Sequence, residues 1–217
     1  MTRTSQIRRA LFATLMTATG LWSIACGDVA RTGRSPAFLV IEALEADAGS
    51  DDTETFGSVL MSDVETVVEV RQGTQTFRVP TRFNDTGRVR LRLALKNPGT
   101  TASPTAPSTL NEITVTRYRV AFRRTDGRST QGVDVPYAFE GGMALTVRAE
   151  GAAEGLFDIV RHTSKTEPPL KNLVGGGAGI FINTIAEVTF YGHDQAGNET
   201  IVSGVLTVNF SDFGDPQ

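Results

Sequence analysis

The sequence is poor in the side chains from which most metal and redox sites are built. Its 217 residues include one cysteine, two histidines and one tryptophan. A single cysteine excludes a disulfide within the chain. Neither His162 nor His193 stands in an HExxH pattern or beside a second histidine, so a zinc site would need carboxylates as well. We predict that both histidines are ordinary surface residues and that the chain carries no cofactor.

The usual catalytic motifs are missing too. The glycine-rich stretch from Gly175 to Gly179 lacks the GK[ST] ending of a phosphate-binding loop, so it is interpreted as a flexible connection. Ser203-Gly204 follows Ile201-Val202 and does not form a GxSxG nucleophile elbow. No catalytic residue is assigned, and the chain is expected not to be an enzyme.

Charge argues against nucleic acid as a partner. Removing Arg3, Arg8 and Arg9 of the N-terminal segment leaves 18 of the 21 basic residues against 24 acidic ones, a formal charge of about −6. The remaining arginines alternate with apolar residues, as in residues 88–92 and 117–119, which is typical of the solvated face of a sheet. The sequence also indicates no small-molecule substrate.

No long apolar run marks a permanent membrane span. From Ala10 to Ile24 the chain is apolar or small and uncharged, but this run is shorter than the roughly 20 residues of a transmembrane helix. It follows three arginines and ends in small residues before a cysteine, which is typical of a cleaved signal peptide. Residues 1–25 are therefore predicted to be removed.

The only cysteine, Cys26, follows this run in the order Leu21-Trp22-Ser23-Ile24-Ala25-Cys26-Gly27. This order resembles the lipobox of bacterial lipoproteins, although Ser23 stands where the family usually has leucine. The resemblance implies cleavage before Cys26, acylation of its thiol and firm anchoring by more than one acyl chain. Lipoproteins of this kind are kept at the inner membrane by an aspartate after the cysteine. Because Gly27 stands there, the resemblance favours the outer membrane of a Gram-negative host.

Beyond a small, polar tether over residues 26–36, the pattern is that of short strands. Residues 89–96 alternate strictly between apolar and other side chains, and Gln72-Gly73-Thr74 separates two runs as a hairpin turn. The apolar set of residues 113–124 changes phase, which predicts a β-bulge near Thr116. Further strands are predicted at 37–44, 67–70, 76–79, 143–147 and 156–160, loops at 45–55 and 97–108, and a helical turn at 170–174.

The last third ends in a strand, a turn Asp194-Gln195-Ala196-Gly197-Asn198 and a second strand. Asp194 can accept backbone N–H bonds, while Gly197 and Asn198 tolerate positive φ. This unit resembles the last hairpin of bacterial immunoglobulin-like domains. The resemblance implies an all-β fold, an antiparallel immunoglobulin-like β-sandwich, and we expect residues 37–217 to form one such domain.

Two weaker chemistries remain open. Calcium needs only oxygen ligands, and carboxylates cluster at Asp47, Asp51, Asp52 and Glu54, at Asp194 and Glu199, and at Asp212 and Asp215, but none has EF-hand spacing. No metal ligand is therefore assigned. An aromatic set, Tyr118, Tyr137, Phe139 and Tyr191, could stack on a sugar or peptide, but packing in the core or at a sheet edge is the more common role of such residues.

The expected function is that of an exported, lipid-anchored envelope protein with a non-enzymatic binding or structural β-sandwich. A protein of the cell envelope is the candidate partner, and strand addition at a sheet edge is one way to bind it. The alternative is a divergent carbohydrate-active or hydrolytic envelope protein. That alternative requires two carboxylates at a specific separation in space.

Overall fold

The computed structural model describes residues 33–50, 54–177 and 179–213, and these residues form mostly strands. The strands are β1 (Ala37–Asp47), β2 (Val59–Asp63), β3 (Thr66–Gln72), β4 (Gln75–Thr81), β5 (Asp85–Leu95), β6 (Gly99–Thr100), β7 (Ser103–Pro104), β8 (Ile113–Arg124), β9 (Phe139–Val147), β10 (Ala152–Val160), β11 (Phe181–Asp194) and β12 (Glu199–Ser211). Three 3-10 helices are η1 (Thr109–Asn111), η2 (Ser164–Thr166) and η3 (Leu170–Leu173). Since these ranges contain no α-helix, the all-β prediction is confirmed for them.

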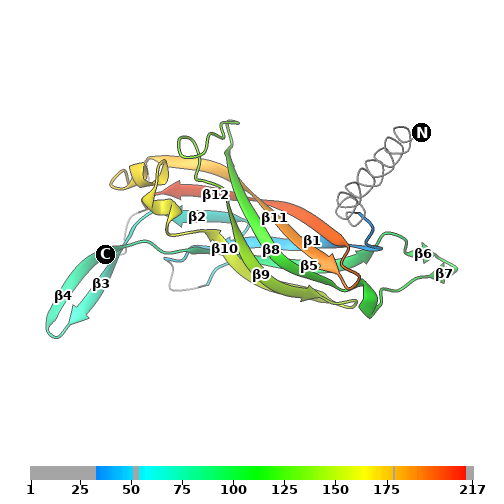
Figure 1. Cartoon of the computed structure of the whole chain (residues 1–217). Helices are drawn as coiled ribbons and strands as arrows, with labels where there is room; N and C mark the ends of the chain where they lie inside the picture. The colour runs from blue at the N-terminus through cyan, green and yellow to red at the C-terminus, as the bar shows by residue number, and fades with distance from the viewer. Residues whose placement is uncertain (1–32, 51–53, 178, 214–217) are drawn as a thin grey trace, which may run out of the picture.

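One antiparallel sheet has the strand order β1–β5–β10 (Figure 1). Its central strand buries every second side chain, namely Val89, Leu91 and Leu93. Arg90 and Arg92 point to the solvent side, where both pair with Glu42 of β1, and Arg90 also pairs with Glu154 of β10. The alternation therefore separates an apolar inner side from a charged outer side, as the sequence predicts.

A second sheet has the order β2–β12–β11–β8–β9. Its long central hairpin pairs β11 with β12 from Phe181↔Ser211 to His193↔Glu199. The short edge strand β2 runs parallel to β12, whereas the other strand pairs of this sheet are antiparallel. The C-terminal half of the chain therefore supplies four of the five strands.

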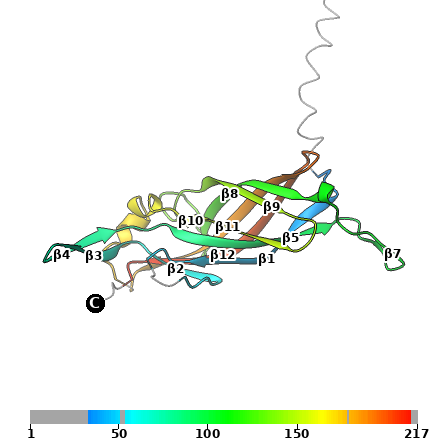
Figure 2. The ribbon, with the colours of Figure 1, turned by 90° about the horizontal axis from the view of Figure 1, so that it is seen from below.

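The two sheets face each other across one hydrophobic core, which draws buried residues from both (Figure 2). The Phe157 ring of β10 lies 5.1 Å from the ring of Tyr118 and 5.4 Å from that of Phe190, both of the second sheet. Gly87 leaves room for this stack, because a Cβ there would lie 2.4 Å from the Phe157 ring. The aromatic stack thus joins the two sheets, and the Phe157 ring lies close to the backbone of β5 at Gly87.

The predicted bulge in β8 is confirmed. Pairing of β8 with β9 shifts register between Val115 and Arg117, and pairing with β11 shifts at the same level, between Tyr191 and Gly192. Val115 and Tyr118 are both buried, although an unbroken strand would place them on opposite faces. The extra residue, Thr116, lets both reach the core.

Strands β3 and β4 leave the body as a projecting hairpin, which we call the arm (residues 66–81) (Figures 1 and 2). Gly73 has a φ of +66° at its turn, so the predicted glycine hairpin is confirmed. From Glu69 to Pro80 every residue is exposed. The arm is therefore held by its own strand pairing rather than by the core.

The predicted loops and the helical turn need small corrections. The segment from Asn97 to Ser108 contains a small hairpin, β6–β7, which reverses between Thr100 and Ser103, where the Ser103 backbone N–H donates to Thr100 Oγ1 at 3.1 Å. The first strand extends through Asp47 and shortens the following loop. The helical turn expected at residues 170–174 is η3, which has 3-10 geometry and places Leu170 and Leu173 in the core.

Candidate functional site

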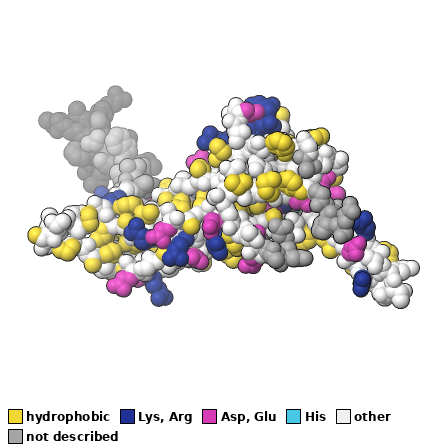
Figure 3. Space-filling view, turned by 180° about the vertical axis from the view of Figure 1, so that it is seen from behind, with side chains coloured by type: hydrophobic (Ala, Val, Ile, Leu, Met, Phe, Trp, Pro, Cys, Tyr) yellow, Lys and Arg dark blue, Asp and Glu magenta, His cyan; other side chains and the backbone are white. Residues whose placement is uncertain are grey.

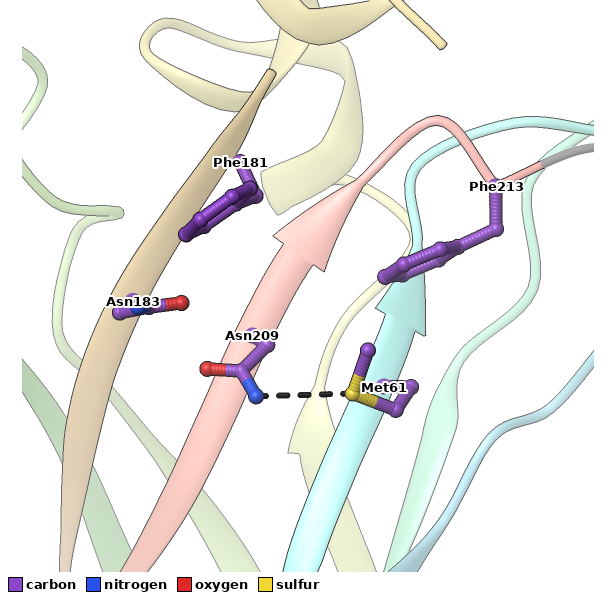
Figure 4. Close-up of a pocket in the computed structure, with 5 residues that line it drawn as sticks. All are labelled: Met61, Phe181, Asn183, Asn209 and Phe213. Carbon is purple, nitrogen blue, oxygen red and sulfur yellow. Dashed lines mark hydrogen bonds between the residues drawn. The ribbon is translucent and has the colours of Figure 1, made fainter. Parts of the chain in front are cut away.

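A hollow opens on the outer side of the second sheet, where β2, β12 and β11 lie next to one another (Figure 4). It measures about 290 Å³ and is lined by Met61, Phe181, Asn183, Asn209 and Phe213. Strand register builds its floor, since Asn183 pairs with Asn209, and Asn209 in turn pairs with Met61. One outward row of three adjacent strands therefore provides two amides and a thioether.

The hollow combines apolar walls with neutral polar groups. Phe181 and Phe213 stand on two sides of it, with Asn209 between them (Figure 4). The Nδ2 of Asn209 donates to the Met61 sulfur at 3.5 Å, a weak acceptor. None of its five lining residues is charged. The lining can stack on an apolar surface and exchange hydrogen bonds with a neutral polar group.

The arm has an uncharged face with apolar residues at its centre. Val68 pairs with Val79 and Val70 pairs with Phe77, so these four side chains lie on one side of the hairpin. Val70, Phe77 and Val79 are 47%, 45% and 41% exposed. An isolated two-stranded hairpin is marginally stable in water, and this apolar face is uncovered in the described part of the chain.

The arm's other face is charged. It carries Glu69, Arg71 and Arg78, which alternate with the apolar residues along β3 and β4. Basic and acidic side chains mark the arm in the view from behind (Figure 3). The arm is therefore amphipathic without a core of its own to cover.

Asp63 connects the arm to the hollow. Its carboxylate accepts a hydrogen bond from Thr66 Oγ1 at 2.8 Å, where the arm begins, and one from the Phe213 backbone N–H at 3.0 Å. Burial raises the pKa of Asp63 above its ordinary value, although these two hydrogen bonds oppose the shift, and nearby Asp212 adds to it. We call the hollow and the apolar face of the arm together the distal surface, because β1 begins at the other end of the body (Figure 1).

The histidines that the sequence singled out lie apart. His162 Nδ1 lies 2.9 Å from Asn84 Oδ1, which can only accept, and His193 Nδ1 lies 3.1 Å from the carbonyl oxygen of Asp194. Both side chains are exposed, as predicted. Among the described residues, no three His, Cys, Asp or Glu side chains come together as a metal site.

Asp194 has a local structural role in its turn. Its carboxylate accepts hydrogen bonds from the backbone N–H of Ala196 and Asn198, each at 2.9 Å, and from Asn198 Nδ2. Gly197 has a φ of +78°, whereas Asn198 does not have a positive φ and instead supplies its amide to Asp194. Chain reversal therefore explains these residues, and only Gly197 uses the left-handed region.

The other carboxylate clusters are only partly described. Asp47 is buried and accepts a hydrogen bond from the Thr55 backbone N–H at 3.0 Å, while Glu54 is exposed. Asp212 accepts a hydrogen bond from the Gly175 backbone N–H, which attaches the glycine-rich connection to the end of β12. The remaining members, Asp51, Asp52 and Asp215, lie outside the described residues.

The predicted aromatic set is divided between core and surface. Tyr118 and Phe139 are buried, and Tyr191 stacks under the Arg117 guanidinium at 3.7 Å. Tyr137 is 51% exposed. These four rings do not form one platform. The two rings that line the hollow, Phe181 and Phe213, were not predicted from the sequence. The available signal was that both, with Asn183 and Asn209, occupy outward positions at one end of the last hairpin.

A buried polar cluster was also missed. Lys165 and Asp85 are 1% and 0% exposed, and Lys165 Nζ lies 2.9 Å from Asp85 Oδ1. Their sequence separation of 80 residues gives no local pattern that would pair them. Lys165 stands in a polar run that sequence reasoning treats as solvated.

Cys26 lies outside the described residues. Within those residues, no helix has the length and apolar character that crossing a membrane requires. No family model matches the chain, and no curated protein matches it.

Proposed function

We propose that the protein is an exported envelope lipoprotein, anchored through Cys26, whose distal surface binds another envelope component without catalysis. The observation that carries this proposal is the position of the distal surface at the end of the body opposite the start of β1 (Figure 1). A lipid on Cys26 would be attached through six further residues, 27–32, before residue 33. The anchored chain would therefore direct its distal surface away from its own membrane.

We further propose that the fold is an immunoglobulin-like β-sandwich. Two facing sheets around one core and the Asp194–Asn198 turn of the last hairpin support this assignment. The hydrolytic alternative has weaker support. The most deeply buried carboxyl, Asp85, is covered by its own partners, and the hollow contains no ionisable lining residue.

The anchor is tested by replacing Cys26 with serine and separating membranes from soluble protein. We expect the wild type in the membrane fraction, solubilised by detergent but not by salt, and Cys26→Ser in the soluble fraction. Membrane retention of Cys26→Ser would contradict lipid anchoring. Ser23→Leu, which restores the usual lipobox residue, serves as the control that keeps the anchor.

Binding is tested by placing a photo-crosslinking amino acid at Phe77 of the arm or at Phe181 of the hollow. Leu156 of β10 is the matched control, since it is 62% exposed and apolar but belongs to the other sheet. We expect one defined crosslinked species at both distal positions and none at Leu156. Equal crosslinking at all three positions would reject the distal surface as the binding site.

A further inference from the structure

The buried pair Lys165 and Asp85 places an amine against a carboxyl group away from water. Asp85 begins β5, and Lys165 lies in η2, the turn that follows β10. Nζ and Oδ1 are 2.9 Å apart, and both side chains are at least nine-tenths buried. A lysine side chain is almost never this deeply buried unless it is paired, so the burial of Lys165 against Asp85 calls for a physical explanation.

Two further groups donate hydrogen bonds to the carboxyl group of Asp85. Ser62 Oγ donates to Asp85 Oδ2 at 2.6 Å, and the Gly49 backbone N–H donates to Oδ1 at 3.1 Å. Both oxygens therefore accept hydrogen bonds from groups fixed in β2 and in the β1–β2 loop. These donors would stabilise negative charge on the carboxyl oxygens if a nucleophile attacked the carbon between them.

Burial also changes which protonation states are favourable. Desolvation raises the pKa of Asp85, although Lys165 and Ser62 oppose that shift. Desolvation makes a charged pair costly in a dry site, whereas amide formation needs the amine and the acid in their neutral forms. A neutral amine held against a carboxylic acid is the reactant pair for amide formation.

We propose that Lys165 and Asp85 join in an intramolecular amide cross-link. A bond forms between Nζ and Cγ of Asp85, and the bond from Cγ to Oδ1 breaks. Oδ1 leaves as water with the acid proton and one amine proton, while Oδ2 remains as the carbonyl oxygen that accepts the Ser62 hydrogen bond. The step needs no oxidant or other reactant, and exclusion of water would oppose its reversal.

The cross-link would serve a chain that has no cysteine available for a disulfide. It would close a loop from β5 to η2 and attach the segment containing η2 and η3 to the first sheet. Such a closure restricts the unfolded chain across 80 residues, in the way a long-range disulfide does. The body would then unfold with this connection still intact.

The test is the mass of the full chain under denaturing conditions, compared with Lys165→Met. We expect the wild type to be lighter by one water molecule than the mass calculated for its N-terminally processed chain, and Lys165→Met, with the same processing, to have its calculated mass. Proteolysis of the wild type should release one branched peptide containing both residues. A wild type without the loss of one water molecule overturns the proposal, whether or not Lys165→Met folds.

Asp85→Asn provides a second measurement, because attack on an amide would release ammonia in place of water. We expect this variant to lose the mass of one ammonia, and Asp85→Ala to remain unlinked. A branched peptide that persists in Asp85→Ala would show that Lys165 reacts with another residue and would overturn the assignment.

Discussion

The body and the arm are made from the same alternating pattern but are stabilised differently. In β5, Val89, Leu91 and Leu93 of one face are buried, whereas in β3 and β4 the paired residues Val70 and Phe77 remain almost half exposed. Burial of an apolar side chain stabilises the fold by about 1.5–3 kcal/mol, and a side chain that stays exposed does not contribute this free energy. Alternation therefore specifies which strand face is apolar, but the presence of an opposing sheet decides whether that face contributes to stability.

Matched phenylalanine substitutions give the largest test of this comparison. Phe190→Ala in the aromatic stack of the body should lower the free energy of unfolding by about 3–5 kcal/mol, since it removes contacts and leaves a cavity. Phe77→Ala in the arm should change it by less than about 0.5 kcal/mol. Urea unfolding followed by circular dichroism measures both, and equal losses would mean that the arm is packed as tightly as the body.

In the body, hydrogen bonds to the Asp194 carboxylate also contribute to the free energy of unfolding. Burial acts to raise the pKa of this carboxyl, but hydrogen bonds from Asn198, Ser35 and Ala196 outweigh it, so the pKa is lower than its ordinary value. Asp194→Asn should cost about 1.5–3 kcal/mol at neutral pH, as expected for hydrogen bonds to a charged group.

The sign of its pH dependence follows from the lowered pKa. The contribution of Asp194 is fully present above the unfolded-state pKa of about 4 and is lost as the pH falls through the lower folded-state value. The difference in unfolding free energy between wild type and Asp194→Asn should therefore shrink in acid. A difference that stays constant from neutral pH into acid would contradict a role for the ionised carboxyl.

Alanine substitutions at two glycines, one in the body and one in the arm, should be destabilising for different reasons. Gly87→Ala should cost about 1–3 kcal/mol by overpacking, since its Cβ would meet the Phe157 ring. Gly73→Ala meets no atom within 4 Å, but its positive φ strains the arm's turn. Global unfolding should report the first substitution, and amide exchange confined to the arm should report the second. A global loss with Gly73→Ala would mean that the two regions unfold together.

The local hydrophobic pattern predicted the strands well because the side chains of one strand face recur at every second residue. The bulge at Thr116, the turn at Gly73 and the strand over residues 113–124 all followed from neighbouring residues. Partners distant in the sequence could not be predicted in this way. The pairing of Lys165 with Asp85 and the meeting of Met61 with Asn209 depend on how strands assemble across the whole chain.

The same reasoning explains why the candidate site was missed while its surroundings were predicted. Phe181 and Phe213 fit a strand pattern, so sequence alone assigns them no task beyond packing. Met61 joins them in one hollow because β2 pairs in parallel with β12, and no pattern within residues 59–63 predicts that partner. A site on the outer face of a sheet becomes visible only once strand order is known.

Removal of the arm should have the smallest effect on stability. Replacing residues 68–79 with two glycines keeps Thr66 at its hydrogen bond with Asp63 and leaves the core residues in place. The unfolding free energy should therefore change by less than about 0.5 kcal/mol, because the removed residues lie outside the core. Crosslinking at Phe181 should nevertheless fall, since the proposed partner would lose the adjoining apolar face. Unchanged crosslinking with unchanged stability would limit binding to the hollow, whereas a large loss of stability would show that the body depends on the arm.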